Sequence, residues 1–466
     1  MDALKKTLKD SAAIRWLVLI IISMFMFGTY WFQDFMSGLK GLMESELGIT
    51  SNQFGLIISS TTWANIFGMI IIGGIILDKW GIRVAGVVFG IVATVGASIT
   101  ALASYKIFGS DPGTMMKFMM VGRMLFGIGL ESICVIVTRT TVKWFKGYEL
   151  ALAMAINVAF GRFGTAFGTA FSVEIGGGHV APAVVFAASL IGLGFILFLA
   201  YLIFDIRLDK QVNAMKKEGE TEDEFKFSDL LKLVTNKGFI YITLLCVAFY
   251  SAVFPFIQYA PDLLVNKFGF SYQLPDMSSM SLFEKINAIF HNGPKVTGLI
   301  PLGTILFTPI FGSVVDKKGK AASLMILGAL LLIFAHVSLS LFDNVTLGYL
   351  GLVSLGIAFA LVPAAMWPSV AKIVAESRLG TAYSTMFTVQ NWGLGAFFWG
   401  IGAVLDYVNR ADLTAIQAGE KVYNYTIPVL MLVVCGIISI FLAFLLLKAD
   451  KQRKYGLELP SGVSAD

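Results

Sequence analysis

The stretch GGIILDKWGIR, residues 73–83, decides the fold, because its pattern recurs as FGSVVDKKGK at residues 311–320. Both copies place a glycine, an acid four positions later, a lysine, and a second glycine in the same order, 238 residues apart. The matching residues are Gly74, Asp78, Lys79, Gly81 and Arg83 in the first copy and Gly312, Asp316, Lys317 and Gly319 in the second. A pattern repeated at this interval predicts an internal duplication.

The sequence around these copies is too apolar for a soluble protein. Of 466 residues, 57% are hydrophobic and only 14% are charged, and the mean hydropathy is +0.79. The apolar runs are long and unbroken, whereas the segments of a membrane β-barrel alternate polar with apolar residues. Because about 20 apolar residues cross a bilayer as a helix, the sequence predicts an all-α polytopic membrane protein.

The apolar runs predict twelve transmembrane helices in two pseudo-symmetric six-helix bundles. The expected spans are 14–39, 53–77, 82–104, 115–143, 149–173, 180–204, 239–265, 295–315, 321–342, 347–374, 380–404 and 425–447. This gives an N-terminal bundle at 1–204, a linker at 205–238, a C-terminal bundle at 239–447 and a tail at 448–466. Each copy of the repeated motif then follows the second span of its bundle.

The distribution of Lys and Arg predicts that both termini are cytoplasmic. On that orientation 24 basic residues lie inside and 8 lie outside, which agrees with the excess of Lys and Arg in cytoplasmic loops. The outer stretch 271–293 is polar and predicts a short helix over the outer entrance. The three cysteines lie in apolar runs and indicate neither a disulfide framework nor a metal site.

The repeated motif resembles the signature loop of the major facilitator superfamily, and GRMLFGIG at 122–129 resembles its fourth-helix motif. Longer strings resemble the lysosomal dipeptide transporter branch: YWFQD at 30–34, GRMLFGIGLES at 122–132, WFKGYELALAMAINVAFGRFG at 144–164, FYSAVFPFIQYAPDLL at 249–264 and WPSVAKIVAESRLGTAYSTMFTVQNWGLG at 367–395. The resemblance implies two bundles that rock about a central site, facilitated diffusion of dipeptides, and a dipeptide site that uses Glu131 and Arg162.

Glu131 and Arg162 also stand out by position alone. By the helix rise, they lie roughly 22 Å and roughly 20 Å from the inner ends of the fourth and fifth spans, near the bilayer centre. A charge there costs about 2.5–3.5 kcal/mol on insertion scales, so it needs a compensating partner. Two interpretations stay open: a buried ion pair that fixes helix packing, or a clamp in which Glu131 binds a ligand ammonium and Arg162 its carboxylate.

Other polar and aromatic residues at similar or outer depth are candidate ligand contacts. Amides can hydrogen-bond a peptide backbone or join helices, and the aromatics can line a cavity or pack. The candidates for substrate binding are Tyr30, Asn65, Asn157, Gln258, Tyr259, Trp367, Gln390 and Asn391. For gating and coupling they are Asp34, Arg123, Arg139 and the residues of the repeated motif, with Asp34 one possible partner of Arg123.

The sequence therefore predicts a membrane transporter of small zwitterions, most simply a uniporter, because it has one carboxylate at midplane depth. No catalytic constellation, cofactor motif or nucleic-acid surface is indicated, and no accessory membrane subunit. The alternatives are an organic-anion or sugar-phosphate carrier and a non-transporting receptor or scaffold. We expect a cell-membrane location, or the lysosomal membrane in a eukaryote, with Asp78 and Asp316 acting in conformational coupling.

Overall fold

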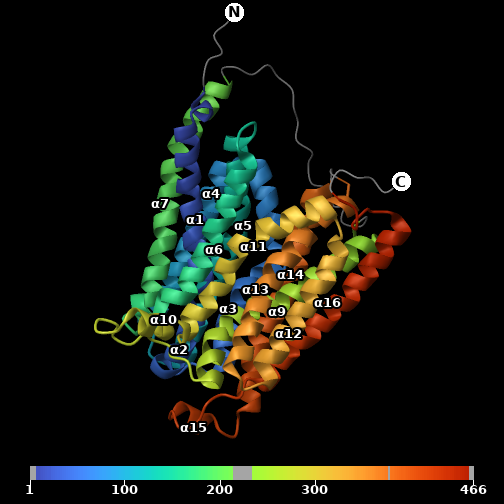
Figure 1. The fold of residues 1–466 in the computed structure, drawn as a ribbon. Helices are drawn as coiled ribbons and strands as arrows, with labels where there is room; N and C mark the ends of the chain where they lie inside the picture. The colour runs from blue at the N-terminus through green and yellow to red at the C-terminus, as the bar shows by residue number, and fades with distance from the viewer. Residues whose placement is uncertain (1–6, 214–232, 376–377, 461–466) are drawn as a thin grey trace, which may run out of the picture.

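The computed structural model describes residues 7–213, 233–375 and 378–460, except for the side chains of residues 78 and 151. Helices account for nearly all of this part, and its one β-bridge joins Ser271 to Asn292. The expected all-α architecture is therefore confirmed. The first and last described segments of the chain lie at one end of the molecule, which we call the terminal end, and α2, α10 and α15 lie toward the opposite, distal end (Figure 1).

The N-terminal bundle consists of helices separated by short turns. It comprises η1 (Leu8–Asp10), α1 (Ala12–Asp34), η2 (Phe35–Leu39), α2 (Lys40–Leu47), α3 (Ser51–Ile66), α4 (Met69–Ser104), α5 (Pro112–Phe145), α6 (Leu150–Ile175) and α7 (Val180–Asn213). The second span is bent by 55° between α3 and the start of α4. The third begins beyond Gly81, whose φ of 75° interrupts α4.

The C-terminal bundle repeats this order. It comprises α9 (Lys237–Phe268), α10 (Leu282–Phe290), α11 (Gly293–Lys318), α12 (Ala321–Leu341), α13 (Val345–Ile373), α14 (Leu379–Val408), α15 (Leu413–Gln417) and α16 (Thr426–Arg453). Gly319, which corresponds to Gly81, also has a positive φ, 70°. Positive φ is the conformation that favours glycine, so both copies of the motif place their second glycine at a turn that requires it.

Nine helices of the described chain are long and apolar enough to cross a membrane, or ten with the bent pair α3 and α4. Two further helices, α6 and α14, are not among these but have 26 and 30 residues, long enough to span about 30 Å. They provide the remaining two of the twelve expected crossings. Helix α6 packs against α11 and α14 packs against α3, so these four helices form the bundle interface.

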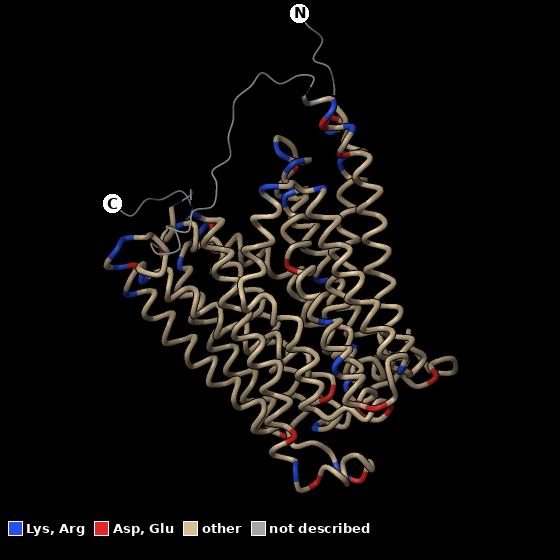
Figure 2. The backbone as a smooth tube through the Cα atoms, turned by 180° about the vertical axis from the view of Figure 1, so that it is seen from behind, with Lys and Arg blue, Asp and Glu red and all other residues tan. Residues whose placement is uncertain are grey.

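Charged residues gather at the two ends of the molecule. Figure 2 shows Lys and Arg clustered at the terminal end, while most of the length of the spans carries neither sign. Some helices extend beyond the expected spans, since α7 continues to Asn213 and α16 to Arg453. The expected linker lies largely outside the described residues.

Close backbone contacts hold neighbouring helices at the interface. A Cβ on Gly127 would lie 1.9 Å from the carbonyl oxygen of Thr61, so α5 and α3 can touch only because residue 127 is glycine. This contact fixes the depth of α5, which carries Glu131 one turn further along.

Candidate substrate-binding site

Glu131 on α5 and Arg162 on α6 are partly exposed and do not pair with each other. Within the described chain neither forms an ion pair with any residue. Each instead contacts the C-terminal bundle. The Arg162 guanidinium lies 4.4 Å from the ring centroid of Phe359 on α13, and Glu131 lies near Asn391 on α14, whose amide donates to the Phe387 carbonyl at 2.9 Å. Two opposite charges therefore lie at the bundle interface, apart and without ionic partners.

Tyr30 on α1 lies beside both charges. It interacts electrostatically with Glu131 and Arg162, and its hydroxyl accepts a hydrogen bond from Cys134 at 3.7 Å. Its ring packs against α6 at Gly161, where an added Cβ would come within 3.1 Å. The N-terminal bundle thus places an acid, a base and a phenol around one region.

The C-terminal bundle faces this region with aromatic rings. Trp367 stacks on Phe387 at 5.0 Å and donates its indole N–H to the hydroxyl of Tyr250 at 3.1 Å. Tyr250 also interacts electrostatically with Arg162. Trp367 and Arg162 are therefore linked through one tyrosine.

The predicted amides divide between helix packing and the interface. Asn65 donates to the Gly127 carbonyl at 3.2 Å, which joins α3 to α5. Gln390 accepts from the Cys246 thiol at 3.3 Å. The side-chain carbonyls of Asn65 and Asn157 are buried without a hydrogen-bond partner. Because buried polar groups are nearly always bonded, these two oxygens are the acceptors in this region that still lack a donor.

At the distal side of the site, two predicted substrate-binding residues, Gln258 and Tyr259, are bonded to protein groups. Gln258 donates to Asp34 at 2.6 Å, and Tyr259 donates to the Phe398 carbonyl at 2.9 Å. The Gln258–Asp34 bond joins the two bundles, whereas the Tyr259 bond lies within the C-terminal bundle.

Arg123 and Asp34 interact electrostatically, but they form no direct ion pair in the described part of the chain. Arg123 is fully buried and donates to the carbonyls of Phe32 at 2.6 Å and Gln33 at 3.0 Å. The last turn of α1 leaves carbonyls without helical partners, and a guanidinium can satisfy two of them at once.

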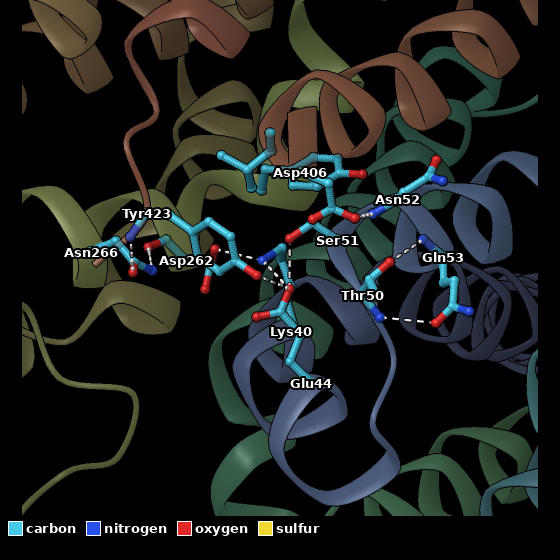
Figure 3. A network of polar contacts seen from close by, with 12 residues as sticks. Lys40, Glu44, Thr50, Ser51, Asn52, Gln53, Asp262, Asn266, Asp406 and Tyr423 are labelled. Carbon is cyan, nitrogen blue, oxygen red and sulfur yellow. Dashed lines mark hydrogen bonds and ion pairs between the residues drawn. The ribbon is translucent and has the colours of Figure 1, made fainter. Parts of the chain in front are cut away.

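A buried charge network closes the distal end. Lys40 on α2 is fully buried and binds Asp262 on α9 at 2.8 Å and Glu44 at 2.7 Å. Tyr272 and Tyr425 also donate to Asp262. Figure 3 shows Lys40 and Glu44 pointing at Asp262 and Tyr423 from the opposite bundle.

Two further polar bridges lie beside this network. The backbone N–H of Asn52 donates to Asp406 at 2.8 Å, joining α3 to α14. Lys295 on α11 binds Glu174 on α6 at 2.8 Å. We call the bridges Lys40–Asp262, Asn52–Asp406 and Lys295–Glu174 the distal seal. The sequence gives no sign of this seal, because Lys40 and Lys295 lie at the outer ends of predicted spans, where a lysine is normally exposed to water.

At the terminal end the two copies of the motif face open space. An added Cβ on Gly74 or Gly312 would have no neighbour within 4 Å. These two glycines therefore mediate no close helix contact in this conformation, because the bundles are apart here. A cavity of about 500 Å³ borders the same part of α11, lined by residues that include Ile310 and Lys317.

The other motif residues lie around these turns. Arg83 binds Asp205 at 2.6 Å and also Asp209, both on α7. Lys79, Lys317, Asp316 and Arg139 are exposed, and the side chain of Asp78 lies outside the described residues. The structure is thus sealed at the distal end and open at the terminal end.

Comparison with known proteins agrees with this architecture. Residues 17–398 match the model of the Major Facilitator Superfamily. The lysosomal dipeptide transporter MFSD1 of Danio rerio is 28% identical over 407 residues, covering 84% of this chain and 81% of that protein. MFSD1 of Gallus gallus is 31% identical over 334 residues, covering 69% and 68%.

Solved transporters share the fold at low identity. The xylose transporter XylE from E. coli, in an inward open conformation, matches with a TM-score of 0.66 and 12% identity over 97% of this chain and 98% of that one. A bacterial homologue of the human lysosomal transporter Spinster, inward-facing and unoccupied, matches with a TM-score of 0.65 and 13% identity over 96% and 99%. From its matched length and its twelve helices, this chain belongs to the major facilitator superfamily.

Proposed function

We propose that this membrane transporter carries dipeptides by alternating access, as a uniporter. The observation that carries the proposal is the separation of Glu131 and Arg162, which lie unpaired at the bundle interface and each contact the opposite bundle. Two such charges are costly in a membrane unless a ligand or water compensates them. A zwitterion would satisfy both.

The separation of the charges favours a dipeptide over a single amino acid. An amino acid would need both charges within reach of one α-carbon, and such neighbours would pair with each other when the site is empty. A dipeptide can place its ammonium at Glu131 and its carboxylate at Arg162, with the guanidinium gripping two oxygens. The unsatisfied carbonyl of Asn157 and the amide of Asn391 can hydrogen-bond the peptide group of the dipeptide without contacting its side chains.

The alternatives fit the geometry less well. A packing ion pair would be closed in this structure, and it is not. An organic anion or sugar phosphate would meet the carboxylate of Glu131 in the same region. A receptor or scaffold would gain nothing from two unpaired charges at a bundle interface. The names of the related MFSD1 proteins also support dipeptides.

The terminal end is the cytoplasmic end in this proposal. The excess of Lys and Arg in the segments at that end, 24 against 8, supports this orientation. The structure then represents the inward-open state. We propose the cell membrane as its location, or the lysosomal membrane if the source is eukaryotic.

Thermal-shift measurements test the dipeptide site. We expect dipeptides to raise the melting temperature of the purified protein, while amino acids and organic anions do not. Glu131→Gln and Arg162→Lys should each abolish this shift and leave the melting temperature of the empty protein nearly unchanged. Glu420→Gln and Arg410→Lys, in exposed positions of the distal loop, are the matched controls and should behave as wild type. Loss of stability without any change in ligand response would instead favour the packing pair.

Reconstituted vesicles test the uniport mechanism. Glu131 is the one carboxylate at midplane depth that we assign to the site, and when it binds the ammonium it cannot also carry a proton. With equal dipeptide on both sides, an imposed pH gradient should therefore cause no net accumulation. External pH should change the rate of exchange only. Accumulation that a protonophore abolishes would show that protons drive transport and would refute uniport.

A further inference from the structure

Helix α10, in the loop between α9 and α11, exposes a continuous apolar face. None of its nine residues is buried, and Leu282 and Phe283 are 75% and 79% exposed. At 100° per residue, these two side chains and those of Ile286, Ile289 and Phe290 fall within an arc of about 120°. Glu284 lies on the opposite side. In water such a face would be costly, because it leaves five large apolar side chains unburied.

The position of α10 is fixed by its C-terminal end. Only residues 291 and 292 separate it from α11. The hydroxyl of Tyr349, in the second turn of α13, donates to the Phe290 carbonyl, and the backbone N–H of Ser271 donates to the His291 carbonyl at 2.9 Å. These bonds hold α10 beside the distal ends of two spans (Figure 1).

We propose that α10 lies in the distal lipid–water interface with its apolar face against the acyl chains. The ends of α11 and α13 mark where the hydrocarbon core ends, and α10 is bonded to both regions. A narrow apolar arc opposite polar residues is the pattern of a helix that lies in the membrane surface. Lys285 borders the arc, where its stem can follow the apolar face and its ammonium can reach lipid headgroups.

This placement connects the lipid surface to the distal seal. The loop that enters α10 carries Tyr272, which donates to Asp262 of the seal. The same loop reaches the N-terminal bundle, because Gln273 lies against Gly178 in the turn between α6 and α7. Anchoring α10 in the bilayer therefore restrains a segment that contacts both bundles.

Spin labelling in lipid nanodiscs tests the proposal. Labels at Ile286→Cys, at the centre of the apolar arc, and at Glu284→Cys, opposite to it, form a matched pair. They are introduced after replacing Cys134, Cys246 and Cys435 by alanine, with the melting temperature as the check on folding. We expect collisions with oxygen, which concentrates in lipid, to be several-fold more frequent at 286 than at 284, and collisions with a water-soluble nickel chelate to show the reverse.

Two results would overturn it. Equal nickel accessibility at both positions would place α10 in water, and protection of position 286 from both reagents would place it against protein.

The wild-type protein provides an independent measurement that needs no cysteine replacement. Phosphatidylcholine with a photoreactive group in its acyl chain should label peptide 282–290 and not peptide 413–417, since α15 lies beyond the ends of the spans (Figure 1). Absence of label on 282–290 would also refute the interfacial position.

Discussion

Lys40 is a fully buried cation that joins the two bundles through Asp262. Two buried ions are stable together because each replaces part of the other's lost hydration, and removing one leaves the other uncompensated at a cost of about 3–5 kcal/mol. In a transporter this cost need not unfold the protein, because opening the distal end returns Asp262 to water. Lys40 is therefore expected to affect the equilibrium between the distal-closed and distal-open folded states.

Lys40→Met should shift the protein toward the distal-open state. Probe distances across the distal end, measured by electron–electron double resonance, should lengthen in a larger fraction of molecules than in wild type. Lys421→Met is the control, because Lys421 pairs with Asp412 in an exposed loop within one bundle. If Lys40→Met lowers the melting temperature but leaves the distance distribution unchanged, then the pair stabilises the fold and does not act as a gate.

At the scale of the helices, the open space at Gly74 and Gly312 separates two roles for glycine. Glycine is required at position 127 in the terminal-open conformation of this structure, because α5 contacts α3 there. The two motif glycines have no neighbour within 4 Å, although Gly312 lies on interface helix α11 and Gly74 on the part of α4 that continues the second span from α3. Their small size can matter only when the terminal end closes.

Gly312→Leu should therefore leave the terminal-open state intact and block its closure. We expect a melting temperature close to wild type, loss of transport, and a shift of the equilibrium away from the distal-open state. Gly192→Leu is the matched control, since Gly192 on α7 also has no neighbour within 4 Å and lies in the interior of a helix. Normal transport by Gly312→Leu would show that closure does not bring a neighbour against this position.

For the whole molecule, alternating access requires the distal seal to break during each cycle. Asn52 and Asp406 meet across the seal from α3 and α14. Cross-linking Asn52→Cys to Asp406→Cys with a short thiol-reactive reagent should stop transport, and reducing the linker should restore it. Asp412→Cys with Lys421→Cys lies within one bundle and should tolerate the same linker. Transport that continues after complete cross-linking of 52 to 406 would contradict a rocking mechanism.

The sequence alone determined the architecture. A helix in lipid must satisfy its own backbone hydrogen bonds, so long apolar runs predict spans almost directly. The repeat around Asp78 and Asp316 predicted the two bundles, and the helix rise placed Glu131 and Arg162 at similar depth. The helices α6 and α14 were also predicted from their apolar runs, although they are not among the nine candidate spans of the described chain.

Only the tertiary structure decided which residues meet. Lys40 and Asp262 are 222 positions apart, and no local pattern relates a lysine after the first span to an acid in the seventh. The same holds for Arg123, which binds carbonyl groups that every residue possesses. The contacts of Gly74 and Gly312 depend on which end is open, and one sequence encodes both states. Periodicity within a helix fixes its length and depth, whereas contacts between bundles depend on how two separately folded units dock.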